Sequence, residues 1–185
     1  ANINTAATQH GFEPMDLSRI DDYRSLGGRE LIARLGLPMW KVPAVTASMR
    51  RAMTEAIGSV RPFNGAVETL QALRARGIAT ALVTSNSAAN VSRVLGPGGM
   101  AHIDHVACGA GIFGKRPLLR RVAKAAGVPA RQALCVGDEL RDADAAAALD
   151  MDFIGVSWGY ATEAVLASRS VRAPLRTFAD LLDAV

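Results

Sequence analysis

The feature that most constrains this chain is a short apolar segment followed at once by acidic residues. Residues 133–136 are apolar, and Asp138, Glu139 and Asp142 come directly after them, ahead of an alanine-rich helical segment. This pattern predicts a buried parallel strand whose carboxyl end presents carboxylates. Because ligands of open α/β sheets bind outside such strand ends, a functional site is expected here.

The acidic residues suit a hard cation. Mg²⁺ takes oxygen ligands and is usually held by one or two carboxylates together with a substrate phosphate. Asp138, Asp142 and Glu139 are therefore candidate metal ligands. The alternative is structural, since acidic residues stabilise the start of a helix and Asp138 could serve as its cap. The stretch alone leaves both interpretations open.

Composition allows a substantial core. The chain has 185 residues, of which 50% are hydrophobic, enough for one domain with an insertion or for two small domains. No apolar run reaches the ~18 residues of a membrane helix, and no signal peptide opens the chain, so no membrane association is expected. Cys108 and Cys135 lie in apolar runs, which favours buried, reduced thiols and a cytoplasmic protein.

The charge pattern argues against nucleic acid. The formal net charge is +4, but the basic residues are scattered and form no stripe with interleaved aromatics. A small anionic substrate explains the same charge. Oligomeric state is not readable from the sequence.

The first 61 residues predict only helices, over residues 2–10, 16–25, 28–35 and 42–57. They should form a small helical bundle, in which an apolar face of the last helix packs. Trp40 lies in a loop between two prolines, where it could be a packing anchor or line a ligand cleft, and packing is favoured. Arg24, Arg29, Arg50 and Arg51 are candidates for gripping an anionic substrate, although each could equally lie on a solvated face.

After a proline and glycine turn at residues 61–65 the pattern alternates between helix and strand. Strands are expected at residues 78–83, 105–108, 134–136 and 153–156, and helices at 66–76, 88–95, 117–126, 143–149 and 178–185. This alternation predicts an α/β fold, a Rossmann-like parallel sheet core flanked by helices, next to the α-helical bundle.

Two further segments carry polar groups where ligands are expected. Ser85 and the backbone amide of Asn86 follow the strand at 78–83 and precede a helix, a position suited to phosphate binding. Alternatively, Ser85 or Ser87 only caps that helix. Lys115 begins another helix, the unfavourable end for a cation, so a phosphate or carboxylate outside the helix is expected as its partner.

Taken in order, these motifs resemble the haloacid dehalogenase (HAD) superfamily. Its motifs II, III and IV are similar to Val83-Thr84-Ser85-Asn86-Ser87, Gly114-Lys115 and Gly137-Asp138-Glu139-Leu140-Arg141-Asp142. The local sequence looks like phosphoglycolate phosphatase-like members. The resemblance implies a C1-type α-helical cap at residues 1–61 and a HAD-like core at 62–185.

The resemblance also implies an activity and residue roles. We expect a Mg²⁺-dependent phosphatase that hydrolyses a small phosphorylated metabolite through an aspartyl-phosphate. Ser85 and Asn86 would bind the phosphoryl group, Lys115 would neutralise it, and Asp138 would ligate Mg²⁺. Asp142 would support the metal site, with Glu139 a weaker candidate. The alternative function is a non-catalytic HAD-like protein that binds a phosphate ligand or a partner.

One motif of the superfamily has no match. Motif I is a strand ending in Asp-x-Asp-Gly-Thr, whose first Asp is the nucleophile, and nothing in these residues fits it. We expect it in a segment of about 20 to 25 residues ahead of Ala1, comprising a central strand, its loop and the start of a helix. The 185 residues alone are then expected to be inactive.

Overall fold

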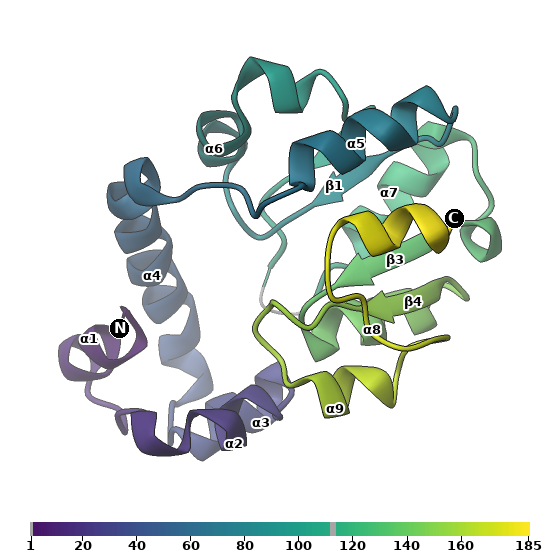
Figure 1. The fold of residues 1–185 in the computed structure, drawn as a ribbon. Helices are drawn as coiled ribbons and strands as arrows, with labels where there is room; N and C mark the ends of the chain where they lie inside the picture. Colours follow the sequence, from purple (N-terminus) through teal and green to yellow (C-terminus); the bar gives the residue numbers. More distant parts are fainter. Residues whose placement is uncertain (1, 112–113) are drawn as a thin grey trace.

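The computed structural model describes residues 2–111 and 114–185, and it consists of a helical unit followed by an α/β unit (Figure 1). In Figure 1 the helical unit, coloured purple to blue, lies to one side of the strands. The prediction of an α/β fold with parallel strands and a helical N-terminal region is confirmed. The boundary between residues 61 and 62 stays a prediction.

The helical unit contains the helices expected from the sequence. They are α1 (Asn2–His10), α2 (Ile20–Arg24), α3 (Gly28–Arg34) and α4 (Val42–Ala56), with short 3₁₀ turns η1 (Leu17–Arg19), η2 (Met39–Lys41) and η3 (Ile57–Ser59). Asp16 opens the second of the predicted helical segments, because its carboxylate accepts a hydrogen bond from the Ser18 amide at 3.0 Å.

Two apolar clusters hold this unit together. Val42 and Val45 of α4 are buried with Leu37, while Tyr23 and Leu35 belong to a second cluster. The expectation that Trp40 packs inside is wrong, since this residue is 77% exposed. Leu37 and Val42 occupy the core positions on either side of it, and the Lys41 amine lies 5.3 Å from the centre of the indole ring instead.

The α/β unit alternates helices and strands. Its helices are α5 (Ala66–Ala75), α6 (Ala88–Met100), α7 (Arg116–Ala126), α8 (Leu140–Ala147) and α9 (Glu163–Ala167), with 3₁₀ turns η4 (Ala130–Gln132) and η5 (Ala179–Asp183). Its strands are β1 (Ala81–Val83), β2 (His105–Ala107), β3 (Leu134–Gly137) and β4 (Asp152–Gly155).

The strands form two parallel pairs. β1 pairs with β2, placing Leu82 opposite Val106, and β3 pairs with β4, placing Cys135 opposite Phe153. Within the described residues, β1 and β3 each have one edge with no strand partner. All strand connections pass through helices, as parallel pairing requires.

Four elements differ clearly from the expectations. β1 begins at Ala81 rather than residue 78, because the Thr80 amide and hydroxyl donate to the Asp104 carboxylate and the His102 carbonyl instead of a ladder. α6 runs on past residue 95 through a kink at Gly96, whose φ of 64° interrupts it before Pro97 restarts the helix. The last segment is the 3₁₀ turn η5, and α9 was not expected.

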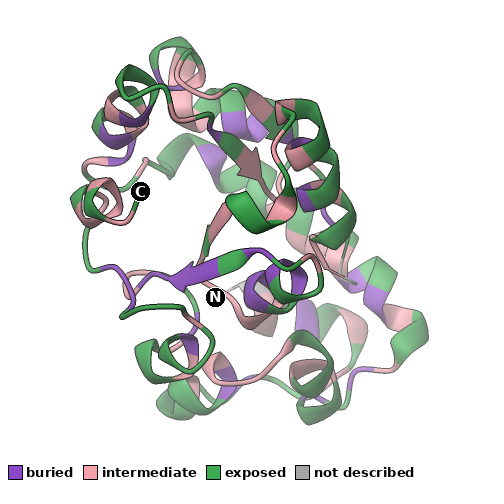
Figure 2. Ribbon diagram, turned by 90° about the vertical axis from the view of Figure 1, so that its right-hand side faces the viewer, coloured by how far each residue is buried: buried purple, intermediate pink, exposed green. Residues whose placement is uncertain are grey.

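Burial is uneven between the two strands of the β3–β4 pair. Most of β4 is buried (Figure 2), and its residues Phe153 and Ile154 belong to the core. Val136 of β3, in contrast, is 38% exposed. Trp158, which follows β4, packs on Phe178 with ring centroids 5.0 Å apart. None of the helices described is both long and apolar enough to cross a membrane.

Candidate active site

A cavity of about 790 Å³ separates the helical unit from the strand ends of the α/β unit. The strand-end side is polar and includes Ser85, Asn86, Glu139 and Arg141. The side facing it is mostly apolar and comes from the helical unit. Its apolar lining consists of Ile3, Met15, Leu17, Ile20, Leu31, Ile32, Leu35, Leu37, Val42, Val45, Met49 and Met53.

The loop after β1, residues 84–87, is here called the hydroxyl loop. Ser87 caps α6, since its hydroxyl accepts a hydrogen bond from the Asn90 amide at 3.2 Å. Ser85 makes no side-chain hydrogen bond within the part of the chain that the structure describes, and it lines the cavity. The capping role considered for either serine thus falls to Ser87, which leaves the Ser85 hydroxyl for a ligand.

Asn86 is more engaged than its predicted role suggests. Its amide donates to the Thr84 hydroxyl at 3.1 Å, and its side-chain oxygen accepts from the Ser87 amide at 3.0 Å and from the Asn90 side chain at 2.7 Å. A phosphate bound to the Asn86 amide would have to displace Thr84. Its phosphate-binding role stays a prediction.

Lys115 is the N-cap residue of α7, and its charge is paired across the fold. Its amine lies 2.7 Å from a carboxylate oxygen of Asp142, in the first turn of α8. The side chains are 14% and 3% exposed, respectively. A carboxylate partner outside the helix, as the sequence predicted, therefore accounts for a cation at this helix start. Both Asp142 oxygens lack a well-aligned hydrogen bond among the described residues, which suits them to further ligation.

Residues 138–142, which comprise the two residues after β3 and the first three residues of α8, are here called the acid loop, and Asp138 at its start is held from the loop that follows β4. Its side chain accepts a hydrogen bond from the Tyr160 amide at 2.9 Å, and its carbonyl accepts from the Ala161 amide at 2.8 Å. Gly159 approaches so closely that a Cβ there would lie 2.0 Å from the Asp138 Cβ. Asp138 is thus fixed by backbone contacts rather than serving as a helix cap.

Glu139 forms a bidentate pair with Arg141. Its two carboxylate oxygens lie 2.6 and 2.7 Å from guanidinium nitrogens, and both side chains line the cavity. Burial lowers the pKa of the Arg141 guanidinium, because it disfavours the charged form. The hydrogen bond to Glu139 and the negative charges of Glu139, Asp142 and Asp138 outweigh burial, so the pKa is raised overall. A metal-ligating role for Glu139 would require this pair to open, and it stays a prediction.

The donor set fits Mg²⁺ with few protein ligands. The described residues contain no group of three or more His, Cys, Asp or Glu side chains placed to hold a metal ion. Asp138 and Asp142 nevertheless supply the one or two carboxylates with which proteins commonly hold Mg²⁺ beside a phosphate. The Oδ2 atom of buried Asp142, which has no hydrogen-bond partner among the described residues, is consistent with that use.

Cys135 lies beneath this site in β3. Burial, followed by the negative charge of Asp142, raises the pKa of its thiol to about 12, against a lowering by Lys115. Both cysteines are free thiols. Cys135 is therefore a packing residue rather than a nucleophile at neutral pH.

The candidate arginines of the helical unit separate into two groups. Arg50 lines the cavity and donates to the Ala110 carbonyl at 2.8 Å, and Arg24 contacts the loop after β4. Arg29 and Arg51 are exposed. Sequence reasoning missed Arg141, although its place between two acidic residues of the same loop was a usable signal.

The chain resembles known proteins over its whole length. The family described as haloacid dehalogenase-like hydrolase matches residues 1–156. A phosphoglycolate phosphatase from Synechococcus elongatus is 27% identical over 186 residues, covering 100% of this chain and 88% of the relative.

Solved structures share the fold. A hydrolase from Pseudomonas syringae superposes with a TM-score of 0.78 at 19% identity, covering 99% of this chain and 87% of that one. CbbY from Rhodobacter sphaeroides, solved in complex with phosphate, gives a TM-score of 0.69 at 20% identity, covering 97% and 87%. At these identities the likeness concerns the fold alone.

Proposed function

The chain belongs to the haloacid dehalogenase-like hydrolase family, and from that premise we propose that it is a Mg²⁺-dependent phosphatase for a small phosphorylated metabolite resembling phosphoglycolate. The observation that carries the proposal is the buried Lys115–Asp142 pair. It places an amine 2.7 Å from a carboxylate whose second oxygen has no hydrogen-bond partner among the described residues, and Asp142 directly follows Arg141, which lines the cavity together with Ser85.

These residues match what phosphoryl transfer needs. Hydrolysis of a phosphate monoester is among the slowest uncatalysed reactions, and its loose transition state is stabilised by positioned charges and donors. The Ser85 hydroxyl donates a hydrogen bond to the phosphoryl oxygens, and Lys115 neutralises their charge. Asp138 and Asp142 would hold Mg²⁺, which would neutralise further negative charge on the phosphoryl group.

We place the nucleophile on an aspartate outside the 185 residues. Its carboxylate oxygen attacks phosphorus as the ester P–O bond breaks, and the second aspartate of the same motif donates a proton to the leaving oxygen, which departs as the alcohol. Water, deprotonated by that second aspartate, then attacks the aspartyl-phosphate, whose acyl P–O bond breaks to release phosphate and restore the carboxylate. An additional strand between β1 and β3 would bring such an aspartate to the ends of both strand pairs. Each of the four strands has one edge without a strand partner among the described residues, and a strand placed here would supply the backbone partner that β1 and β3 both lack.

The cavity walls support the substrate class. Arg50 and Arg141 are cations lining it, so a substrate with a second anionic group besides the phosphate has partners at hand. The helical unit serves as a cap that closes over the site and limits water. The free thiols accord with a cytoplasmic enzyme, and no nucleic-acid or membrane partner is proposed.

Phosphate release tests the proposal. A protein that includes the expected segment with the nucleophilic aspartate ahead of Ala1 should release phosphate from phosphoglycolate in the presence of Mg²⁺. EDTA should stop this release, and Asp138→Asn should abolish turnover. Asp144→Asn, on the exposed face of α8, is the matched control. Residues 1–185 alone should be inactive, and an intact mass of the natural protein above 19.4 kDa would show that a further segment exists.

Binding without turnover would indicate the alternative function. If the protein with the aspartate segment binds phosphate but never releases it from a monoester, the phosphatase proposal fails. The same cavity would then belong to a non-catalytic ligand-binding protein.

A further inference from the structure

Arg24 of the helical unit contacts the loop that holds Asp138. Its Nε donates to the Tyr160 carbonyl at 2.5 Å, and a terminal nitrogen donates to the Gly159 carbonyl at 3.1 Å. These are the backbone contacts of α2 with residues 159–160 of the α/β unit, and Ser25 lies beside Thr162 with hydroxyl oxygens 3.5 Å apart.

The two peptide groups that Arg24 contacts are those that hold Asp138. The peptide with the Gly159 carbonyl carries the Tyr160 amide, which donates to the Asp138 carboxylate at 2.9 Å. The next peptide, with the Tyr160 carbonyl, carries the Ala161 amide, which donates to the Asp138 carbonyl at 2.8 Å. Each peptide therefore accepts from Arg24 at one end and donates to Asp138 at the other.

This arrangement strengthens the two hydrogen bonds that the Tyr160 and Ala161 amides donate to Asp138. A cation bound to a peptide carbonyl polarises that peptide, so its amide becomes a better hydrogen-bond donor. A guanidinium can contact two neighbouring carbonyls at once because its donors form a rigid planar fork. Because Gly159 has no side chain, the loop can approach Asp138 this closely.

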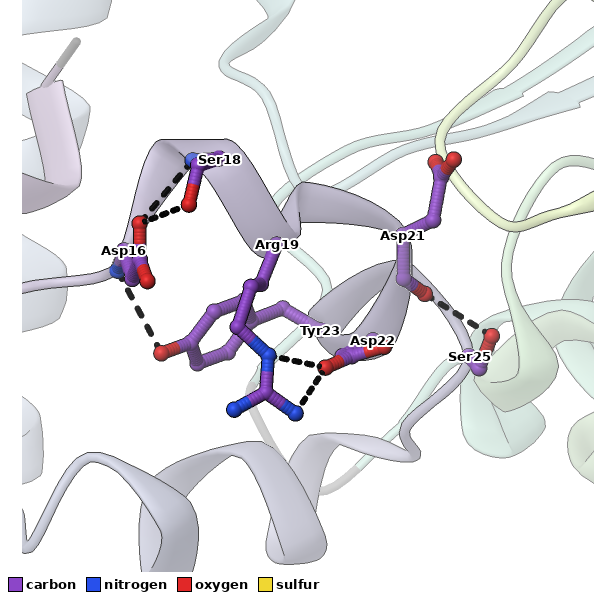
Figure 3. Close-up of polar contacts among 7 residues, drawn as sticks. All are labelled: Asp16, Ser18, Arg19, Asp21, Asp22, Tyr23 and Ser25. Carbon is purple, nitrogen blue, oxygen red and sulfur yellow. Dashed lines mark hydrogen bonds and ion pairs between the residues drawn. The ribbon is translucent and has the colours of Figure 1, made fainter.

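The helix that carries Arg24 is itself well fixed. Figure 3 shows that the Asp16 amide donates to the Tyr23 hydroxyl at 3.3 Å and that the Ser25 hydroxyl donates to the Asp21 carbonyl at 2.9 Å. Asp21 also accepts from the Arg24 guanidinium at 3.0 Å. The side chain is thus held in place, with 31% of it exposed, before any ligand binds.

We propose that Arg24 is a positioning residue that sets Asp138 for metal binding when the helical unit is seated on the α/β unit. The inference rests on the proposed function, in which Asp138 ligates Mg²⁺. This contact gives the helical unit a role beyond covering the substrate. When the helical unit closes over the site, Arg24 binds two peptide groups, and these in turn hold the carboxylate proposed to bind the metal.

Two readouts test this role in the full protein. In Arg24→Ala, hydrogen exchange of the Tyr160 and Ala161 amides without metal should be at least about tenfold faster. The Mg²⁺ concentration for half-maximal phosphatase activity should rise about tenfold, the usual effect of removing a residue that orients a metal ligand. Lysine keeps the positive charge but lacks the planar fork of the guanidinium. In Arg24→Lys, the amide exchange rates and the Mg²⁺ concentration for half-maximal activity should therefore lie between those of Arg24→Ala and wild type.

Arg19→Ala is the matched control. Arg19 pairs with Asp22 on the exposed side of the same segment, as Figure 3 shows, and it should leave both readouts unchanged. If Arg24→Ala raises only the substrate KM, with amide exchange and Mg²⁺ dependence as in wild type, Arg24 binds substrate and the inference is wrong.

Failure of the proposed function has a different signature. A wild-type protein without Mg²⁺-dependent phosphatase activity overturns that function, while amide exchange still decides whether Arg24 holds the loop. Unchanged exchange in Arg24→Ala overturns the positioning role whatever the activity.

Discussion

The hydroxyl loop after β1 and the acid loop after β3 differ in the charge of the groups that hold them. The hydroxyl loop is uncharged and is held by neutral hydrogen bonds among its own residues, to α6, and with the backbone of residues 107–110. The acid loop is charged and is held by ion pairs, within itself and with Lys115 at the start of α7, as well as by the amides of residues 160–161.

In the hydroxyl loop different residues stabilise the fold and face the ligand cavity, whereas in the acid loop one residue has both a stabilising and a proposed ligand-binding role. In the hydroxyl loop the capping residue Ser87 and the cavity residue Ser85 are different side chains. In the acid loop Asp142 is both the buried partner of Lys115 and a candidate ligand. Substitutions should therefore have separable effects after β1 and combined effects after β3.

The largest effect is expected for Asp142→Asn. It leaves Lys115 buried without its partner, and breaking a buried pair in this way costs about 3–5 kcal/mol of the free energy of unfolding. Urea unfolding measures the loss. Asp144→Asn on the same helix removes an exposed pair with Arg169 and should cost less than about 1 kcal/mol. Equal losses in the two variants would contradict the comparison.

Gly159→Ala should come next. Its Cβ would lie 2.0 Å from the Cβ of Asp138, so the loop must shift, at a cost of about 1–3 kcal/mol. Thermal unfolding gives the stability, and Mg²⁺ dependence of activity should weaken in parallel. Gly28→Ala meets nothing within 4 Å and serves as the control. A Gly159→Ala protein as stable as Gly28→Ala would show that the close approach is not required.

The two serines of the hydroxyl loop should separate. Ser87→Ala removes the cap of α6 and should cost about 1 kcal/mol of stability with unchanged kcat/KM. Ser85→Ala should leave stability unchanged and lower phosphatase kcat/KM about tenfold, through loss of one hydrogen bond to the phosphoryl group. Chemical unfolding and steady-state kinetics on both variants decide the matter. If Ser87→Ala lowers kcat/KM and Ser85→Ala does not, the assignments are reversed.

The smallest effect concerns Cys135 and pH. Burial raises the pKa of its thiol in the folded state to about 12 from the ordinary 9.0, so between pH 9 and pH 12 the unfolded chain loses this proton while the folded chain largely keeps it. The stabilisation is therefore complete below pH 9 and is lost as the pH rises toward 12. At pH 9.5 wild type should have lost about 0.8 kcal/mol more than Cys135→Ala, by urea unfolding across this pH range. Cys108→Ala is the control, and identical pH curves for wild type and Cys135→Ala would contradict the burial argument.

Local sequence signals predicted much of the fold. The apolar run before Asp138 and the glycines that close helices gave elements within a few residues of those observed. The kink at Gly96 and the 3₁₀ turn η5 were missed, because both depend on local backbone geometry that periodicity does not encode.

The site was predictable only as a set of candidates. The unfavourable helix position of Lys115 pointed to a charged partner, but Asp142 could be identified only once α7 and α8 were placed together. The contact of Arg24 with residues 159–160 joins groups more than 130 residues apart, and no spacing rule encodes their pairing. Polar residues at strand ends are visible in a sequence, whereas their partners depend on tertiary structure.

The two tryptophans lie in different units of the molecule, so their fluorescence can report on each unit. Trp40 lies exposed on the helical unit, and Trp158 stacks near Phe178 on the α/β unit. Emission from the exposed indole should lie at longer wavelength than emission from the packed one. Release of the helical unit and melting of the strand-bearing unit could therefore be followed as separate fluorescence changes, with no added label.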